Sequence, residues 1–211
     1  MEPREKGRVI VAVIDDDSNI RDAIESLLQS VGLLSQSFGS VAEFLSSPRQ
    51  NNLGCLVLDV RLPGKSGLEF YEDLIRANVR LPVVFISGHA DVPMSVRAMK
   101  AGAVEFLTKP VHHQDLLDAI QQALARDRVR RNEESSIAVV RANFEELTYR
   151  EREVMALVVA GHPNKKIASD MALSVTTVKL HRGQVMRKMR APSLAELVRM
   201  AESLRLSGPK A

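Results

Sequence analysis

The sequence has one cysteine, Cys55, and no segment typical of a membrane or secreted protein. A single cysteine has no intrachain partner, which excludes an internal disulfide framework and fits a reducing compartment. No run of ~18 apolar residues occurs, so no membrane-spanning helix is expected. The charged start, MEPREKGR, lacks the pattern of a secretory signal peptide. We therefore expect a cytoplasmic protein with no membrane partner.

Charge is distributed unevenly along the 211 residues, and no internal repeat is present. Residues 1–125 hold 12 Lys and Arg against 16 Asp and Glu, a net charge of −4. Residues 126–211 hold 17 against 10, a net charge of +7. This length allows two domains. A basic part joined to an acidic part indicates two functions, one of them on a polyanion, and random surface variation is the alternative.

The first 125 residues alternate short β-rich runs with amphipathic stretches. The expected strands are Val9–Ile14, Leu33–Ser37, Cys55–Leu58, Val83–Ile86 and Val104–Leu107. The expected helices are Ser18–Val31, which Ser18 can cap, Ser40–Leu45, Leu68–Ala77, Val92–Ala101 and Gln114–Ala125. This order predicts a flavodoxin-like α/β fold with a five-stranded, parallel, doubly wound sheet covered on both faces. Such sheets carry function at the carboxyl ends of their strands.

Polar residues follow four of the expected strands, and parallel strands bring these ends to one edge. They are Asp15, Asp16 and Asp17, then Asp59, Ser87 and Lys109. Neighbouring carboxylates repel one another unless a positive charge lies between them. Mg²⁺ suits such hard oxygen ligands, and a lysine supplies a point charge for a phosphoryl group. The alternative for each residue alone is a solvated turn or a helix cap.

Four motifs give residues 9–125 a strong resemblance to a response-regulator receiver domain. They are VAVIDDD (11–17), CLVLDVRLPGKSG (55–67), PVVFISGH (82–89) and AVEFLTKP (103–110). The resemblance implies a phosphoacceptor at Asp59 and a Mg²⁺ site made by Asp15, Asp16, Asp59 and the backbone carbonyl of Arg61. It also implies a phosphoryl-binding Lys109, a switch formed by Ser87 and Phe106, a sensor histidine kinase as donor, and a cis Lys109–Pro110 bond. Asp17 is expected to lie on the surface or behind the ligands.

The helix expected at Val92–Ala101 is the candidate output surface of this switch. Four of its residues are candidates for an exposed face that forms a homodimer after phosphorylation: Met94, Arg97, Ala98 and Lys100. The alternative is that Met94 and Ala98 pack inward.

Residues 126–147 are polar, charged and free of glycine and proline, and we expect a helical linker between two domains, 1–125 and 148–211. Its apolar residues form a short helical stripe at Ile137, Val140, Phe144 and Leu147. Packing on a neighbouring domain and pairing in a dimeric coiled coil both remain open.

From residue 148 onward the chain is expected to form an all-α domain of four helices. They are Arg150–Ala160, Asn164–Met171, Thr176–Met189 and Ser193–Leu204, and the second and third form a helix-turn-helix. Residues 165–191 hold seven Lys and Arg against one acidic residue. Val178, Val185 and Met189 form the apolar face of the third helix. The opposite face would enter the major groove, and it carries Thr176, Lys179, Leu180, Gly183 and Arg187. Phosphate contacts are expected from Lys165, Lys166, Arg182 and Lys188.

The stretch 147–189 resembles a LuxR-type DNA-binding domain, and the whole chain resembles the NarL/FixJ group of response regulators, on the FixJ side. Two residues depart from the pattern. Tyr149 stands where the family usually has proline, which would loosen the start of that helix, and Gly183 supplies no side chain for base recognition. The resemblance implies a transcription regulator, not an enzyme, with promoter DNA and RNA polymerase as partners. An adaptor that binds protein through its helical end is the alternative, and a phosphohydrolase lacks a second acid or base near Asp59.

Overall fold

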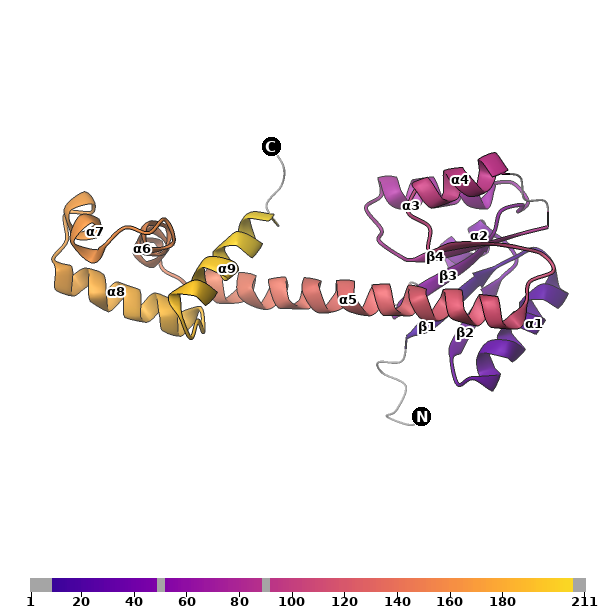
Figure 1. Cartoon of the computed structure of the whole chain (residues 1–211), viewed down its shortest axis with the longest axis horizontal. Helices are drawn as coiled ribbons and strands as arrows, with labels where there is room; N and C mark the ends of the chain where they lie inside the picture. Colours follow the sequence, from indigo (N-terminus) through magenta and orange to yellow (C-terminus); the bar gives the residue numbers. More distant parts are fainter. Residues whose placement is uncertain (1–8, 49–51, 89–91, 207–211) are drawn as a thin grey trace. The chain divides into compact units, whose positions relative to one another are not determined.

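The computed structural model describes residues 9–48, 52–88 and 92–206, which belong to two compact units (Figure 1). Unit 1 spans Met1–Arg130 and unit 2 spans Arg131–Ala211. The division falls inside one helix, within the segment 126–147 that the sequence predicts as a helical linker. Each unit has its own hydrophobic core, so each is described by itself.

Unit 1 is built on the parallel sheet that the sequence predicts. The strands are β1 (Ile10–Ile14), β2 (Leu34–Phe38), β3 (Leu53–Asp59), β4 (Val83–Ser87) and β5 (Glu105–Thr108). They lie in the order β2-β1-β3-β4-β5, and each pair of neighbours is parallel. β1, β3 and β4 are almost wholly buried, as expected of strands with helices on both faces.

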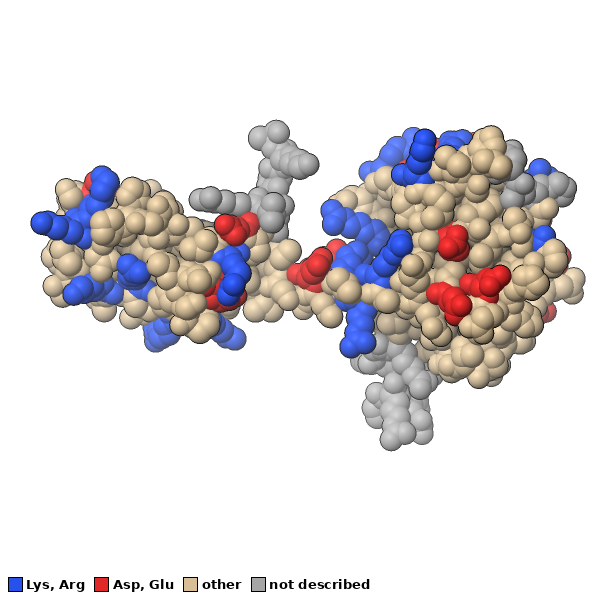
Figure 2. Space-filling view, in the orientation of Figure 1, with Lys and Arg blue, Asp and Glu red and all other residues tan. Residues whose placement is uncertain are grey.

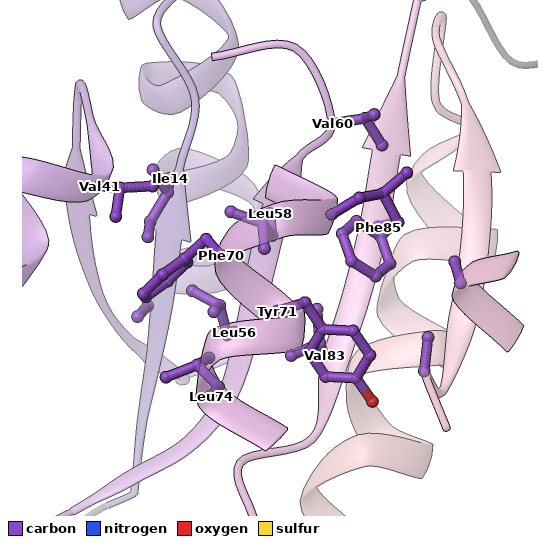
Figure 3. Close-up of a cluster of buried hydrophobic side chains, with 14 of the residues drawn as sticks. Ile14, Val41, Leu56, Leu58, Val60, Phe70, Tyr71, Leu74, Val83 and Phe85 are labelled. Carbon is purple, nitrogen blue, oxygen red and sulfur yellow. The ribbon is translucent and has the colours of Figure 1, made fainter. Parts of the chain in front are cut away.

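Helices cover both faces of this sheet. They are α1 (Ser18–Ser30), α2 (Val41–Ser46), α3 (Gly67–Arg76), α4 (Val92–Lys100) and α5 (His113–Glu145). One core lies between the sheet and α2, α3 and α4, and the other lies between the sheet and α1 and α5. Figure 3 shows Phe70, Tyr71 and Leu74 of α3 packed against Leu56 and Phe85 of the strands. Because these two cores pack on both faces of the sheet, they hold the carboxyl ends of its strands in place.

The start of α1 differs from the prediction. Asp17, not Ser18, is the N-cap, and its carboxylate accepts the backbone N–H of Asn19 at 2.9 Å. Asp and Ser are similarly good caps, so their order in the sequence does not decide between them. The side chain of Asp17 is exposed and caps the helix. It lies outside the group of carboxylates that Asp15 and Asp16 form with Asp59.

α5 corrects the expected end of a helix at Ala125. It continues to Glu145, because residues 126–145 contain no glycine or proline that would stop it. Leu147 is buried in the core of unit 2, and Val140 and Phe144 pack against the same core. This part of the predicted stripe therefore packs internally on the helices that follow it.

Unit 2 contains the four expected helices. They are α6 (Tyr149–Val159), α7 (Asn164–Asp170), α8 (Val175–Lys188) and α9 (Leu194–Leu206). Thr148 and Glu151 form a capping box at the start of α6, which offsets the missing proline at Tyr149, so the expected loosening is not seen. Ser174 caps α8, and Gly161 follows α6 with φ +84°, as the sequence suggests.

In the described ranges 9–48, 52–88 and 92–206, no helix is both long enough and apolar enough to cross a membrane.

Candidate functional site

Three carboxylates meet at the carboxyl edge of the sheet in unit 1. Asp15 and Asp16 follow β1, and Asp59 ends β3, which pairs directly with β1. Each of the three residues offers an oxygen within 4.8 Å of the other two. The side chains of Asp15 and Asp59 are buried and Asp16 is exposed. The structure thus brings together residues that are 44 positions apart in the sequence.

Lys109 lies against the two buried carboxylates. Its Nζ donates to Asp15 Oδ2 at 2.7 Å and to Asp59 Oδ2 at 2.6 Å. Burial lowers the pKa of Lys109, but the bonds to Asp15 and Asp59 outweigh burial and leave this pKa raised. Burial raises the pKa of Asp15, and the bond from Lys109 only partly opposes it. One ammonium group therefore neutralises part of a buried acidic pair.

The three carboxylates also match the donor set that Mg²⁺ requires. The ion takes oxygen ligands at about 2.0–2.1 Å, so ligand atoms on one ion lie within roughly 4.2 Å of one another. The oxygens of Asp15, Asp16 and Asp59 lie within 4.8 Å of one another, which is close to this spacing. The donor chemistry therefore agrees with the Mg²⁺ site that the resemblance to a receiver domain implies.

Two residues that the sequence did not single out shape the backbone of this site. Gly67, the first residue of α3, approaches Asp59 so closely that an added Cβ would lie 2.1 Å from the Asp59 carbonyl oxygen. Arg21 of α1 donates through Nη1 to the carbonyl oxygens of Asp15 at 2.7 Å and Asp16 at 3.0 Å. A glycine eight residues after a strand-end aspartate is a weak sequence signal, and nothing in the sequence marks Arg21.

Ser87 and Phe106 lie on neighbouring strands. Ser87 is buried at the end of β4, and its carbonyl oxygen accepts the backbone N–H of Lys109 at 2.8 Å. Phe106, on β5, is partly buried, and its ring centroid lies 6.1 Å from that of Phe85 on β4. The Lys109–Pro110 peptide bond is cis, as the resemblance implies.

The α4 face differs from the prediction at Ala98 and Met94. Ala98 is fully buried, and Met94 packs partly against the core, because these positions face the sheet. Arg97 is exposed and pairs with Glu72, and Lys100 is exposed. A different set of residues forms an exposed apolar stripe along α4: Val92, Val96 and Met99.

In unit 2, α8 carries the two predicted faces. Val178, Val185 and Met189 are buried in the core. The expected reading face is exposed at Thr176, Lys179, Leu180, Gly183 and Arg187, and Lys165 and Lys166 are exposed on α7. Figure 2 shows Lys and Arg scattered over the visible face of unit 2, with fewer Asp and Glu among them.

Lys188 departs from the expected phosphate contact. Its Nζ donates to Glu151 Oε2 at 2.7 Å and to the carbonyl oxygen of Glu146 at 3.2 Å. Glu151 is buried, so its charge requires a partner within the fold, and the bond to Lys188 lowers the pKa of this carboxyl. Lys188 therefore fastens α8 to the start of α6.

Two other polar contacts hold α8 in place. Arg182 Nη1 donates to Asn164 Oδ1 at 2.9 Å, which ties α8 to the first residue of α7. The buried Asn143, near the end of α5, donates through Nδ2 to the carbonyl oxygen of Met189 at 3.5 Å. A buried polar residue on α5 gives no signal in the sequence, because Asn143 is one of many polar residues in the linker.

These two regions define a class of protein. Buried carboxylates with a lysine bound to them, at the edge of a parallel sheet, form a site suited to phosphoryl transfer, because the ammonium can offset the charge of the phosphoryl oxygens. A helix-turn-helix with an exposed basic helix is suited to bind DNA. One chain that contains both is a signal-receiving DNA-binding regulator.

Comparison with known proteins agrees with this class. Residues 11–121 match the family described as the response regulator receiver domain, and residues 145–201 match the bacterial regulatory proteins of the luxR family. Nodulation protein W of Bradyrhizobium diazoefficiens is 50% identical over 200 residues, which cover 95% of this chain and 88% of that protein. Transcriptional regulatory protein FixJ of Azorhizobium caulinodans is 41% identical over 191 residues, 90% of each chain.

A solved structure of the response regulator StyR is also similar. It has 43% sequence identity and a TM-score of 0.84, over 93% of this chain and 99% of that one. The chain therefore belongs to the two-component response regulators that join a receiver domain to a LuxR-type DNA-binding domain. Members of this family with a DNA-binding output domain regulate transcription and are generally not enzymes.

Proposed function

We propose that Asp59 accepts a phosphoryl group from a sensor histidine kinase and thereby controls promoter binding by α8. The observation that carries this proposal is the contact of Lys109 Nζ with Asp59 and Asp15 at the edge of the sheet. Promoter DNA and RNA polymerase as partners would place the protein in the cytoplasm.

In the proposed transfer, a carboxylate oxygen of Asp59 attacks the phosphorus of a phosphohistidine in line with the leaving nitrogen. The new P–O bond forms as the P–N bond breaks, and the imidazole of the kinase leaves with the electron pair. The ammonium of Lys109 offsets charge on the phosphoryl oxygens, a role that its raised pKa supports because the group stays protonated.

Mg²⁺ would be held by the carboxylates of Asp15, Asp16 and Asp59 and by the backbone carbonyl of Arg61. When bound, it supplies positive charge for the phosphoryl oxygens. The chain's own residues prepare this arrangement. Asp59 Oδ1 accepts the backbone N–H of Arg61 at 3.0 Å, and Asp15 Oδ1 accepts that of Asp17 at 3.0 Å. Both carboxylates are thereby oriented.

A surface next to the site would receive the kinase. An apolar hollow of about 490 Å³ is lined by residues of α1 and by the segment from Lys109 to Leu116. Because Lys109 belongs to this lining and also contacts Asp59, a helix docked in the hollow would present its phosphohistidine close to the acceptor.

The output of the switch would run through β5 and α4. The hydroxyl of Ser87 would bond a phosphoryl oxygen, and Phe106 would turn inward beside Phe85, a change between two packings driven by a new charge. The homodimer would form through the exposed apolar stripe of α4, Val92, Val96 and Met99, with Arg97 and Lys100 at its border. Ala98 takes no part, because it is buried.

The DNA contacts would come from the exposed face of α8. Lys179 would reach a guanine edge or a phosphate, and Leu180, which is 63% exposed, would meet a thymine methyl. Thr176, Arg182 and Arg187 on α8 and Lys165 and Lys166 on α7 would complete the contacts. Lys188 is left out because its ammonium is bound to Glu151.

The direct test compares the DNA affinity of the whole protein with and without beryllofluoride, which mimics the aspartyl phosphate. We expect affinity to rise by roughly 5- to 150-fold, the range of a coupling of about 1–3 kcal/mol. The Asp59→Asn variant should show no change with beryllofluoride. Equal affinities in the wild-type protein would disprove phosphorylation control.

A further inference from the structure

Gly183 is an exposed glycine in the middle of α8, on the face proposed to read DNA. A Cβ built at this residue would have no neighbouring atom within 4 Å. Along the same face lie Leu180, one turn before, and Arg187, one turn after, and both side chains are exposed. The face therefore has a notch between two projecting side chains, open to solvent in the free protein.

Nothing in the fold of unit 2 requires glycine at this position. Glycines with positive φ occur at Gly32, Gly64, Gly102 and Gly161, where another residue would be strained. Gly54 and Gly67 lack room for a side chain. Gly183 has helical backbone and open space, and glycine is among the least favourable residues inside a helix.

A glycine of this kind is useful where the backbone itself must approach a ligand. The major groove of B-DNA is about 12 Å wide, and an α-helix with its side chains is roughly 10–12 Å across. The helix nearly fills the groove, so a side chain that points at the groove floor sets how deeply the helix can enter. A position without a side chain on that face allows the closest approach.

We propose that Gly183 is the point at which the backbone of α8 meets the base edges at the floor of the major groove. Its missing side chain sets the depth at which α8 is inserted, and this depth brings Lys179, Leu180 and Arg187 within reach of the DNA. The inference rests on the proposed DNA binding by α8. Gly183 thereby contributes to specificity through shape, without a hydrogen-bonding group of its own.

The test uses the full-length variants Gly183→Ala and Gly183→Leu and a DNA duplex that the wild-type protein selects from a random pool. Both variants should raise the thermal midpoint of unit 2, by roughly 4–8 °C for alanine, because both residues favour a helix more than glycine does. DNA affinity should fall although stability rises, slightly for Gly183→Ala and at least about tenfold for Gly183→Leu.

The matched control is Ala156→Leu, which enlarges an exposed small residue on α6 that has no proposed DNA contact. This variant should bind the duplex as the wild-type protein does. Wild-type affinity in Gly183→Leu, or an equal loss in Ala156→Leu, would overturn the inference and leave the proposed function intact. Failure of the wild-type protein to select any duplex would overturn the proposed function itself.

Discussion

The acidic site of unit 1 and the reading face of unit 2 are built in opposite ways. Asp15, Asp59 and Lys109 are largely buried and bind one another, so their geometry is fixed before any partner arrives. Thr176, Lys179 and Leu180 are exposed on α8, so their side chains lose rotamer freedom only when a ligand covers them. A chemical step requires groups held in place in advance, whereas a surface that recognises DNA requires groups that remain accessible.

The same contrast applies to what supports each region. The acidic site is shaped by a close backbone contact between Gly67 and Asp59. The reading helix is held from behind, by the contacts of Lys188 with Glu151 and of Asn143 with Met189. Substitutions in unit 1 should therefore alter the acidic site directly. Substitutions in unit 2 should alter either the contacts that hold α8 in place or the side chains that would touch DNA.

The largest effect is expected from Asp59→Asn. An amide oxygen is a poor nucleophile, so labelling of the protein by a small phosphoryl donor such as acetyl phosphate should be abolished. Phosphate-affinity electrophoresis measures the fraction of protein that is phosphorylated. The control is Asp22→Asn, which neutralises an exposed carboxylate on α1 and should be labelled normally. Full labelling of Asp59→Asn would assign the acceptor elsewhere.

The next largest effect is expected from Gly67→Ala, because the added Cβ would lie 2.1 Å from the Asp59 carbonyl oxygen. We expect the free energy of unfolding of unit 1 to fall by about 1–3 kcal/mol or more. Gly183→Ala should instead stabilise unit 2 by about 1 kcal/mol. Tyr71 and Tyr149 are the only tyrosines, one in each unit, so fluorescence during urea unfolding of Tyr149→Phe proteins reports unit 1 alone. Equal signs for the two alanine variants would contradict the contrast.

Glu151→Gln tests the support of the reading helix. The bond from Lys188 lowers the pKa of Glu151 below its ordinary value of 4.5, so the carboxylate stabilises unit 2 above that pH. This stability is lost as the pH falls through the lowered pKa, when the carboxylate takes up a proton. The variant should lose roughly 1–3 kcal/mol at neutral pH and show a weaker acid dependence.

Thermal unfolding of unit 2 between pH 3 and pH 7 measures this effect. Glu202→Gln on α9, an exposed carboxylate, is the matched control and should leave the profile unchanged. A Glu151→Gln profile that keeps the acid dependence of the wild-type protein would show that the pair with Lys188 does not control it.

The smallest effect is expected for Lys179→Ala on the reading face. Removal of one phosphate contact should reduce the slope of log affinity against log salt by about 1. Titrations of the selected duplex at several salt concentrations give this slope. Arg199→Ala removes an exposed charge on α9 and should leave the slope unchanged. An unchanged slope for Lys179→Ala would assign that residue to a base edge or to no contact.

The acidic site could be predicted well because its requirements are visible in the sequence. Asp15 and Lys109 each follow a strand and Asp59 ends one, and a parallel sheet brings strand ends to one edge. The contribution of Gly67 was not visible, since the distance to the Asp59 carbonyl depends on how α3 starts. Arg21 was missed because any arginine on an amphipathic helix has the same pattern.

The fold of α5 shows a second kind of limit. The sequence predicts a helical stripe at Ile137, Val140, Phe144 and Leu147 and leaves open whether an internal core or another chain covers it. The structure packs Val140, Phe144 and Leu147 on the core of unit 2. Periodicity identifies the buried face of a helix and says nothing of what buries it.

The sequence by itself determined the order of strands and helices, the residue types at the strand ends and the basic face of α8, because these follow from local periodicity and composition. Only the tertiary structure decided which side chains on those surfaces are exposed and free to contact a partner. Ala98 and Lys188 were expected to be available to partners, but one is buried against the sheet and the other binds Glu151. Burial and pairing depend on neighbours that lie far away in the sequence, and for this reason local pattern does not fix them.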